Sequence, residues 1–246
     1  MPESAPVALV TGAARRVGAV IARRLHAAGY DVVLHHRRSG DAASALQAEL
    51  ESERAGSTLV LQAELAEFDR LPELIAQAVG RFGRLDALVN NASAFYPTPI
   101  GGTVPAQWDE LFASNARAPF FLSQAAVPHL RKARGAIVNL VHVYAERPLA
   151  EHTLYCMAKA ALAMMTLSLA KELGPEIRVN AVAPGAVLWP EQGKAQAEQD
   201  AMIAGTALQR AGTPEDVAEA VRWLVQDAHY TTGQVLRVDG GRFLRI

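Results

Sequence analysis

The sequence predicts an α/β fold in which residues 1–246 form a single domain around a doubly wound parallel sheet of about seven strands. Short apolar runs alternate with longer amphipathic segments along the whole chain, as in parallel sheets flanked by helices. The runs are apolar at consecutive positions, which is typical of strands buried on both faces. We find no linker, internal repeat or low-complexity tract that would divide the chain.

The seven short apolar runs are the expected strands. They cover residues 7–10, 31–36, 58–62, 85–90, 136–141, 177–182 and 234–238. Helices are expected between them, over roughly 17–28, 41–54, 69–82, 106–132, 154–173 and 214–227. The first helix shows apolar residues at helical spacing and ends at Gly29. The last begins at Thr213, a capping residue followed by proline and two acids.

The least regular stretch covers residues 186–212, which are polar and rich in Gly and Gln. It follows the end of an expected strand, where open α/β sheets bind their ligands. We therefore interpret it as a substrate loop that closes over the site. An ordinary surface excursion is the alternative.

Composition excludes several classes of function. Half of the residues are hydrophobic and the formal net charge is −1, so a large core is expected and a nucleic-acid partner is not. The single cysteine, Cys156, cannot form an intrachain disulfide and fits a reducing cytoplasm. The first residues lack the pattern of a secretory signal, and no apolar run approaches the ~18 residues that span a membrane.

A glycine-bearing turn over residues 11–18 lies between the first strand and the first helix. Gly12 allows a tight turn and Gly18 allows close packing of helix on strand, so the helix amino end, with Val17, faces a nucleotide pyrophosphate. Arg16 stands where such turns usually have a middle glycine. It either begins a solvated helix or directs its guanidinium at cofactor phosphates or an anionic substrate edge.

The second strand ends in a basic run, His35, His36, Arg37, Arg38 and Ser39, of which the last four are expected to contact the cofactor. A site for NADH would place an acid near this point to bind the ribose hydroxyl. Two arginines and a serine instead suit a 2′-phosphate, which favours NADPH. A charged loop after a strand is the simpler alternative.

Tyr155 and Lys159 are four residues apart and therefore share one face of a helix. A nearby ammonium favours the phenolate, so Lys159 is expected to make Tyr155 a better acid near neutral pH. Taken alone, this spacing is frequent by chance.

These features together resemble the short-chain dehydrogenase/reductase family over nearly the full length. The matching motifs are residues 11–18, Asn90-Asn91-Ala92, Asn115, Tyr155 with Lys159, Pro184-Gly185 and Asp239-Gly240-Gly241. The resemblance implies a Rossmann fold that binds NAD(P)(H), with Tyr155 as proton donor and Lys159 on the nicotinamide ribose. It implies that Asn115 holds a water linked to Lys159. Cofactor contacts are implied for Glu64, Leu65, Asn91, Ala92, Pro184 and Gly185.

Two departures from the family narrow the resemblance. The family's usual serine, thirteen positions before the tyrosine, is His142 here, and Arg16 replaces a glycine. Arg16, the basic run after the second strand and the segment Ser93-Ala94-Phe95-Tyr96-Pro97 resemble the pteridine reductases. That subgroup reduces biopterin, folate and related dihydropterins with NADPH.

The residue types fit a pterin. A flat heteroaromatic ring needs an aromatic wall, which Phe95 would supply against the nicotinamide, although a core position for Phe95 is the alternative. Ser93 and Arg16 would pair with the polar edge of the pterin. His142, where pteridine reductases carry Asp, would position substrate or deliver a proton and give a limb in the pH–rate profile; a wall histidine is the alternative. Trp189 is expected to line the pocket.

The sequence therefore predicts an oxidoreductase that acts on CH–NH groups, moving a hydride from NADPH to a C=N bond of a small-molecule pterin. The first alternative is an NADPH-dependent carbonyl reductase of the 3-oxoacyl type. The remote alternative is a non-catalytic NADPH-binding sensor. We assign no metal ligands. The apolar helix after Tyr155 and the family resemblance imply a homotetramer.

Overall fold

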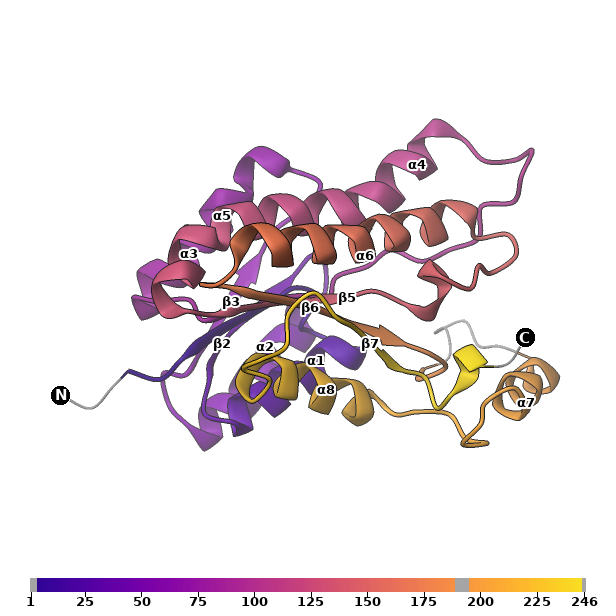
Figure 1. Ribbon diagram of the computed structural model, residues 1–246. Helices are drawn as coiled ribbons and strands as arrows, with labels where there is room; N and C mark the ends of the chain where they lie inside the picture. Colours follow the sequence, from indigo (N-terminus) through magenta and orange to yellow (C-terminus); the bar gives the residue numbers. More distant parts are fainter. Residues whose placement is uncertain (1–3, 189–194, 245–246) are drawn as a thin grey trace.

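The computed structural model describes residues 4–188 and 195–244 and confirms the predicted fold class (Figure 1). Seven parallel strands form one sheet in the order β3-β2-β1-β4-β5-β6-β7. Their bounds are β1 Val7–Val10, β2 Asp31–His36, β3 Thr58–Gln62, β4 Ala87–Asn90, β5 Ala136–Leu140, β6 Arg178–Pro184 and β7 Val235–Val238. Each lies within two residues of its prediction.

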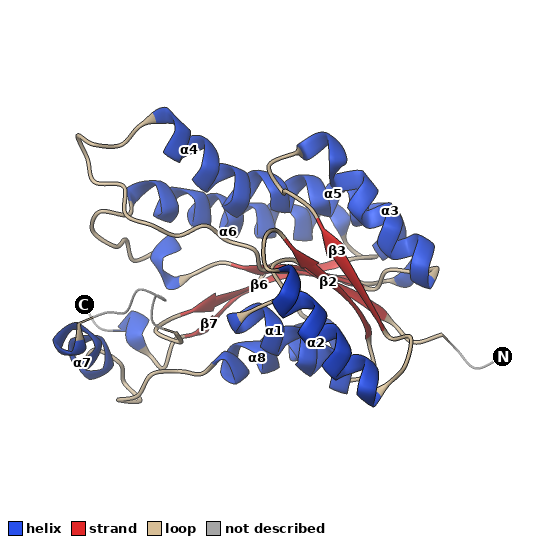
Figure 2. Ribbon diagram, turned by 180° about the vertical axis from the view of Figure 1, so that it is seen from behind, coloured by secondary structure: helices blue, strands red, loops and turns tan. Residues whose placement is uncertain are grey.

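Helices cover both faces of the sheet (Figure 2). One layer contains α1 (Arg16–Ala27), α2 (Gly40–Glu53) and α8 (Pro214–Gln226). The other contains α3 (Leu71–Phe82), α5 (Ala118–Ala133) and α6 (Thr153–Leu173), with α4 (Pro105–Phe112) at its end. Short 3-10 turns cover Phe68–Arg70, Val143–Ala145 and Arg242–Leu244.

Alternate residues of each central strand feed two separate cores. In β1, Ala8 and Val10 pack with the α1 and α8 side, whereas Val7 and Leu9 pack with the α3 and α5 side. All four side chains are fully buried. Burial on both faces explains why the strands are apolar at consecutive positions rather than alternating.

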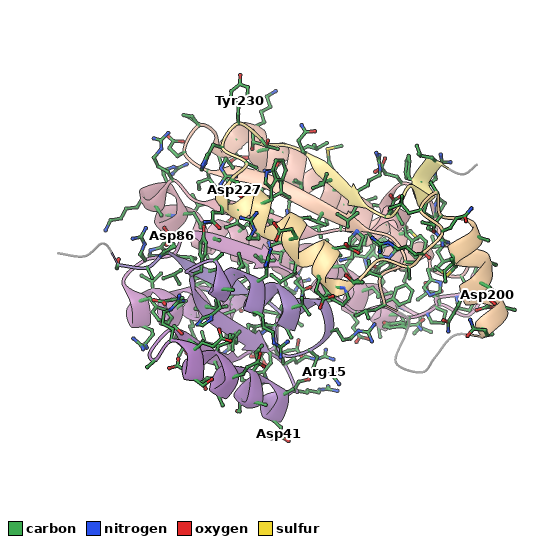
Figure 3. All side chains as sticks on the ribbon, turned by 90° about the horizontal axis from the view of Figure 1, so that it is seen from below. Arg15, Asp41, Asp86, Asp200, Asp227 and Tyr230 are labelled. Carbon is green, nitrogen blue, oxygen red and sulfur yellow. The ribbon has the colours of Figure 1, made fainter. Side chains whose placement is uncertain are left out.

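The strand order reverses between β1 and β4, which are neighbours in the middle of the sheet. Crossovers to β2 and to β5 therefore leave in opposite directions and open a crevice beyond the carboxyl ends of these strands. Figure 3 shows this polarity: Asp86, just before β4, and Asp200 of α7 (Gln196–Ala204) lie at opposite ends of the molecule. The sites described below lie at the carboxyl end.

The helix expected over 106–132 is interrupted, which corrects the sequence prediction. The chain forms α4, then a π-helical segment over Ala113–Arg117, then α5 with Pro119 in its first turn. Proline has no N–H to donate, so α-helical hydrogen bonding cannot run unbroken through this point. π segments often occur at functional sites, and this one holds Asn115.

The stretch 186–212 is more ordered than expected, because α7 lies within it. Trp189, expected to line the pocket, lies outside the described residues. Among the described helices, α6 is long and apolar enough to span a membrane by length and composition, a property that the sequence interpretation missed. It packs on β6 and carries the buried Lys159, and core helices of globular proteins pass the same test.

Candidate functional site

The turn after β1 is tied to the end of β4. The Thr11 hydroxyl accepts hydrogen bonds from the backbone N–H of Asn91 (2.9 Å) and of Ala92 (3.0 Å). The Asn91 side chain donates to the carbonyls of Thr11 (2.8 Å) and Gly12 (3.2 Å). Two motifs nearly 80 residues apart in the sequence thus form one rigid wall of the crevice.

Two glycines make this wall possible. Gly12 has a φ of +64°, a left-handed conformation that glycine adopts without strain. A Cβ at Gly18 would lie 2.1 Å from the Gly12 carbonyl oxygen, so any side chain there would displace the turn. Backbone groups at the start of α1 are consequently left open to an approaching phosphate.

Arg16 begins α1 in the left-handed region, with a φ of +54°. This is the conformation for which glycine is favoured, and a residue with a side chain adopts it at a cost of about 1 kcal/mol or more. Arg16 lines the same crevice as the glycine turn. The arginine therefore occupies a strained position at the pyrophosphate end of the site.

The crevice is a cleft of about 490 Å³ that gathers most of the expected cofactor residues. Its lining includes Gly12, Arg16, Val17, Gly18, His36, Arg37, Arg38, Ser39, Glu64, Leu65, Asn91, Ala92 and Ser93. Figure 3 shows Arg15 and Asp41, at the starts of α1 and α2, toward the same edge of the molecule in that view. The glycine wall at one part of the lining and the basic run at another fit a dinucleotide.

The basic run lies at the start of α2. Arg37 and Arg38 are exposed, and Arg37 Nη1 lies 3.7 Å from a carboxylate oxygen of Glu64. Ser39 precedes the helix without capping it through its side chain. The Nδ1 atom of His36 is buried without a hydrogen-bond partner among the described residues, which fits a bound polar group at this position.

His35 is a site residue that the sequence interpretation did not single out. Its ring is buried and joins two walls of the cleft: Nδ1 accepts from the Gly12 N–H (3.2 Å), and Nε2 lies 3.1 Å from the Ala63 carbonyl oxygen. Burial lowers the pKa of His35 to about 4. The ring is therefore neutral near pH 7, with Nδ1 as acceptor and Nε2–H as donor.

Tyr155 and Lys159 meet on the inner face of α6. The Lys159 ammonium lies 5.7 Å from the centre of the Tyr155 ring and donates to the Leu140 carbonyl (2.8 Å). Burial lowers the pKa of Lys159 to about 7. The expected lowering of the Tyr155 pKa by Lys159 is not found in the chain alone, because burial raises the Tyr155 pKa and outweighs the opposing Ser93 hydroxyl.

Asn115 and Ser93 connect this pair to the cleft. Ser93 donates to the Asn115 side-chain oxygen (2.7 Å), and the Asn115 amide donates to the carbonyls of Ala94 (2.9 Å) and Leu111 (3.0 Å). Asn115 was expected to hold a water linked to Lys159, and that role stays a prediction. Its side-chain amide and oxygen hold the loop after β4 against the π-helical segment.

Aromatic rings gather around the phenol. Phe95 is 44% exposed, so it is not the core aromatic of the alternative interpretation. Its ring packs edge-to-face on Tyr155 with centres 4.8 Å apart, and it stacks on His152 at 4.7 Å. His152, at the start of α6, was not anticipated as a site residue. Its position three residues before Tyr155, one helical turn away, is the signal that could have identified it.

His142 lies beside the phenol but is not a proton donor of ordinary acidity. Its ring is 6.1 Å from that of Tyr155 and stacks on Tyr144 at 4.2 Å. Burial, reinforced by the charges of Lys159 and Arg242, lowers the His142 pKa to about 3. Nδ1 accepts from the Tyr144 N–H (3.2 Å), which leaves the proton on Nε2 as a donor. A shift in this direction would move the expected His142 limb of the pH–rate profile well below pH 6.5, and the limb stays a prediction.

Pro184 and Gly185 lie at the end of β6, at the same edge of the sheet. Gly185 donates to the Val238 carbonyl (3.0 Å), and a Cβ there would lie 2.7 Å from the Asp239 side chain. The motif thus packs on β7 and does not line the cleft described above. Within residues 4–188 and 195–244, no three or more His, Cys, Asp or Glu side chains are grouped to hold a metal.

Comparison with known proteins places this geometry in context. The family described as enoyl-(acyl carrier protein) reductase matches residues 12–242. Pteridine reductase 1 of Leishmania tarentolae is 38% identical over 97% of this chain and 96% of its own. A putative ketoacyl reductase of granaticin polyketide synthase from Streptomyces violaceoruber is also 38% identical, over 98% and 97%. The 3-oxoacyl-[acyl-carrier-protein] reductase FabG of Staphylococcus epidermidis is 34% identical, over 96% and 98%.

The buried neutral His35 predicts an acid-sensitive fold. Its pKa in the folded chain (about 4) lies below the ordinary value of 6.5, so the unfolded chain takes up the proton first. The free energy of unfolding should fall by up to about 3 kcal/mol between pH 6.5 and pH 4 on this account. Urea unfolding of wild type and His35→Asn across this range measures the effect. The gap between the two proteins should narrow as the pH falls; parallel curves would contradict the assignment.

His142 predicts a second measurement. We expect kcat to fall roughly tenfold or more in His142→Ala, because a donor near the phenol is lost, and to recover in part in His142→Asn, whose amide can donate. The pH–rate profile between pH 5 and 8 should keep its shape in both variants. A limb near pH 7 that persists belongs to another group such as Lys159. A limb that disappears with the imidazole would show that His142 titrates.

Proposed function

Because the chain belongs to the short-chain dehydrogenase/reductase family, and is therefore an oxidoreductase that uses a nicotinamide cofactor, we propose that it is an NADPH-dependent pteridine reductase. The substrate is an oxidised or dihydro pterin of the biopterin or folate type. The reaction adds a hydride and a proton across a C=N bond.

The observation that carries this proposal is the placement of Phe95. A half-exposed phenyl ring at the proton donor supplies a flat wall for a heteroaromatic substrate. A simple keto group needs no such wall. Ser93, hydrogen-bonded to Asn115, and Arg16 both line the cofactor cleft, and they would supply polar groups for the amino-oxo edge of a pterin. The identity to pteridine reductase 1 agrees with this reading.

The roles of the residues follow from their surroundings. When bound, the reduced nicotinamide supplies the hydride. Burial keeps the Tyr155 phenol protonated, so it holds the proton that a substrate nitrogen receives. Lys159, one helical turn away, supplies positive charge that stabilises the phenolate left behind. His142 donates through Nε2–H and orients the substrate rather than protonating it.

The preference for NADPH is supported by the residues after β2. Arg38 and Ser39 line the cleft at the start of α2, whose amino end also favours a phosphate. No acid follows β2 in the run that ends at Ser39. Glu64 is engaged by Arg37. Guanidinium groups and a helix start suit a 2′-phosphate better than a ribose hydroxyl.

A 3-oxoacyl-type carbonyl reductase is the second candidate, because the two ketoacyl reductases match the chain nearly as well as pteridine reductase 1. Neutral His142 could donate to a carbonyl oxygen as a serine would. A non-catalytic NADPH-binding sensor is disfavoured by the pairing of Tyr155 with Lys159. It would bind NADPH without oxidising it on any pterin or ketone.

We further propose a soluble cytoplasmic homotetramer. One observation supports assembly: large apolar side chains of α5 and α6 are exposed. They are Phe120, Phe121, Met157, Met164 and Leu167. A second copy that covers this surface would remove apolar area from water.

The pterin assignment is tested by comparing kcat/KM for dihydrobiopterin, dihydrofolate and simple 3-keto esters with NADPH. We expect pterins to be preferred. Phe95→Ala should lower kcat/KM for dihydrobiopterin about tenfold to hundredfold, because the stacking face and its apolar area are lost. Tyr230→Ala, which removes a fully exposed ring remote from the site, is the control. Preference for keto esters, with no effect of Phe95→Ala, would establish the carbonyl reductase instead.

The cofactor assignment is tested with Arg38→Ala. Removing a guanidinium that pairs with a phosphate should raise the Kd for NADPH about tenfold to hundredfold and leave the Kd for NADH nearly unchanged. Fluorescence titration measures both constants. Arg131→Ala, at the far end of α5, controls for loss of one positive charge. Equal effects on both cofactors would contradict a role at the 2′-phosphate.

A further inference from the structure

The chain after β7 turns back over the carboxyl end of the sheet. Gly240 (φ +62°) and Gly241 (φ +80°) form the turn, and the Asp239 carboxylate accepts from the N–H of Gly241 (2.9 Å) and Phe243 (2.7 Å). A Cβ at Gly240 would lie 2.6 Å from the Thr206 side chain. The tail is thereby held against the segment after α7, beyond the carboxyl end of β7 (Figure 1).

Three arginines gather around this tail. The Phe243 ring lies under the guanidinium groups of Arg237 (3.8 Å) and Arg147 (4.7 Å), and Arg242 precedes it in the chain. Arg237 forms an ion pair with Glu146 (2.6 Å). Within the described ranges, Arg147 and Arg242 have no carboxylate partner. Arg242 is half-buried, and its guanidinium donates to the Met202 carbonyl (3.3 Å).

The tail that carries Arg242 lies beside the turn that carries His142, because Arg147, whose guanidinium lies over the Phe243 ring, donates its backbone N–H to the carbonyl of Val143 (2.9 Å). The charge of Arg242 acts on His142 and on Tyr144, whose rings stack on each other beside Tyr155. The contacts from the phenol therefore run from Tyr155 to His142 and Tyr144, and the same turn carries Arg147, which lies over Phe243 next to Arg242. A substrate whose reacting ring lies at Tyr155 would extend past His142 toward the guanidinium.

We propose that Arg242, with Arg147 beside Phe243, binds an anionic group carried on the part of the substrate that is not reduced. A guanidinium in a half-buried position loses part of its hydrogen bonding to water. A carboxylate or phosphate can replace those hydrogen bonds, because the planar guanidinium binds it with two of them. The Phe243 ring fixes the direction of Arg147 by a cation–π contact. This inference deepens the proposed function, on which it rests only in requiring that a substrate reaches Tyr155.

Two kinds of substrate carry such an anion: a pterin with a glutamate tail, through its carboxylates, and an acyl thioester, through the phosphates of its carrier. Each kind has a partner without the anion. Dihydrofolate is paired with dihydrobiopterin, and acetoacetyl coenzyme A with the uncharged N-acetylcysteamine thioester of acetoacetate. Comparison within a pair measures the effect of the anion, and comparison between the pairs shows which chemical group is reduced.

The test is Arg242→Gln, with Arg210→Gln as the matched control. Arg210 lies in the same region but is engaged by Asp216 (3.3 Å). For whichever pair of substrates the protein reduces, Arg242→Gln should raise the KM of the anionic substrate about tenfold or more and change its kcat little. The KM of the substrate without the anion should stay within about twofold of the wild-type value. Raising the salt concentration should weaken wild-type binding of the anionic member and have little effect in the variant.

Outcomes for the two proposals are distinct. An effect confined to acetoacetyl coenzyme A, in a protein that does not reduce pterins, would support the anion site and reject the pteridine reductase. Equal effects on both members of a pair, or the same effect from Arg210→Gln, would overturn the anion site whichever substrate is reduced. If neither pair is turned over, binding of dihydrofolate and dihydrobiopterin to the NADPH-loaded protein, followed by tryptophan fluorescence, decides in the same way.

Discussion

The turn between β1 and α1 closes only because Gly18 has no side chain, since a Cβ there would meet the Gly12 carbonyl at 2.1 Å. That close approach sets the distance between α1 and the end of β1, and the other walls of the cleft are attached to the same turn. Thr11 and Asn91 fasten the turn to β4, and His35 fastens it to the loop after β3. Three successive crossovers therefore converge on one backbone-lined cleft, and a dinucleotide would bind to a surface that is already formed.

Burial dominates the chemistry at the other end of the cleft. The same exclusion of water raises the pKa of Tyr155 and lowers the pKa values of Lys159 and His142. The chain thus holds a protonated phenol, an ammonium near its titration point and a neutral imidazole within one cluster. At neutral pH the phenol holds its proton, but with a raised pKa it is a weak acid until positive charge stabilises the phenolate. The neutral imidazole of His142 would orient the substrate through its Nε2–H.

The sequence pattern determined the strands because two-sided burial in a parallel sheet leaves an unmistakable run of apolar residues, as at 31–36 and 136–141. Motif spacing likewise located Gly12, Gly18, Tyr155 and Lys159, since each works through local backbone geometry. What it missed depends on tertiary contacts. His35 acts across two crossovers, His152 through a stack on Phe95, and Arg242 through a turn that returns the chain end to the site. The sign of the His142 pKa shift also required the surroundings of the ring.

The π-helical segment between α4 and α5 contains one residue more per turn than a continuous α-helix would. Removing a single residue there would change the register between α4 and α5, and each residue corresponds to a rotation of about 100°. The preceding helix, Pro105–Phe112, would be turned to present a different face to α6, and Asn115 would leave Ser93. The number of residues in this segment therefore fixes the contact between Asn115 and the loop after β4. Insertions and deletions in related chains should accordingly occur before Pro105 rather than within 113–117.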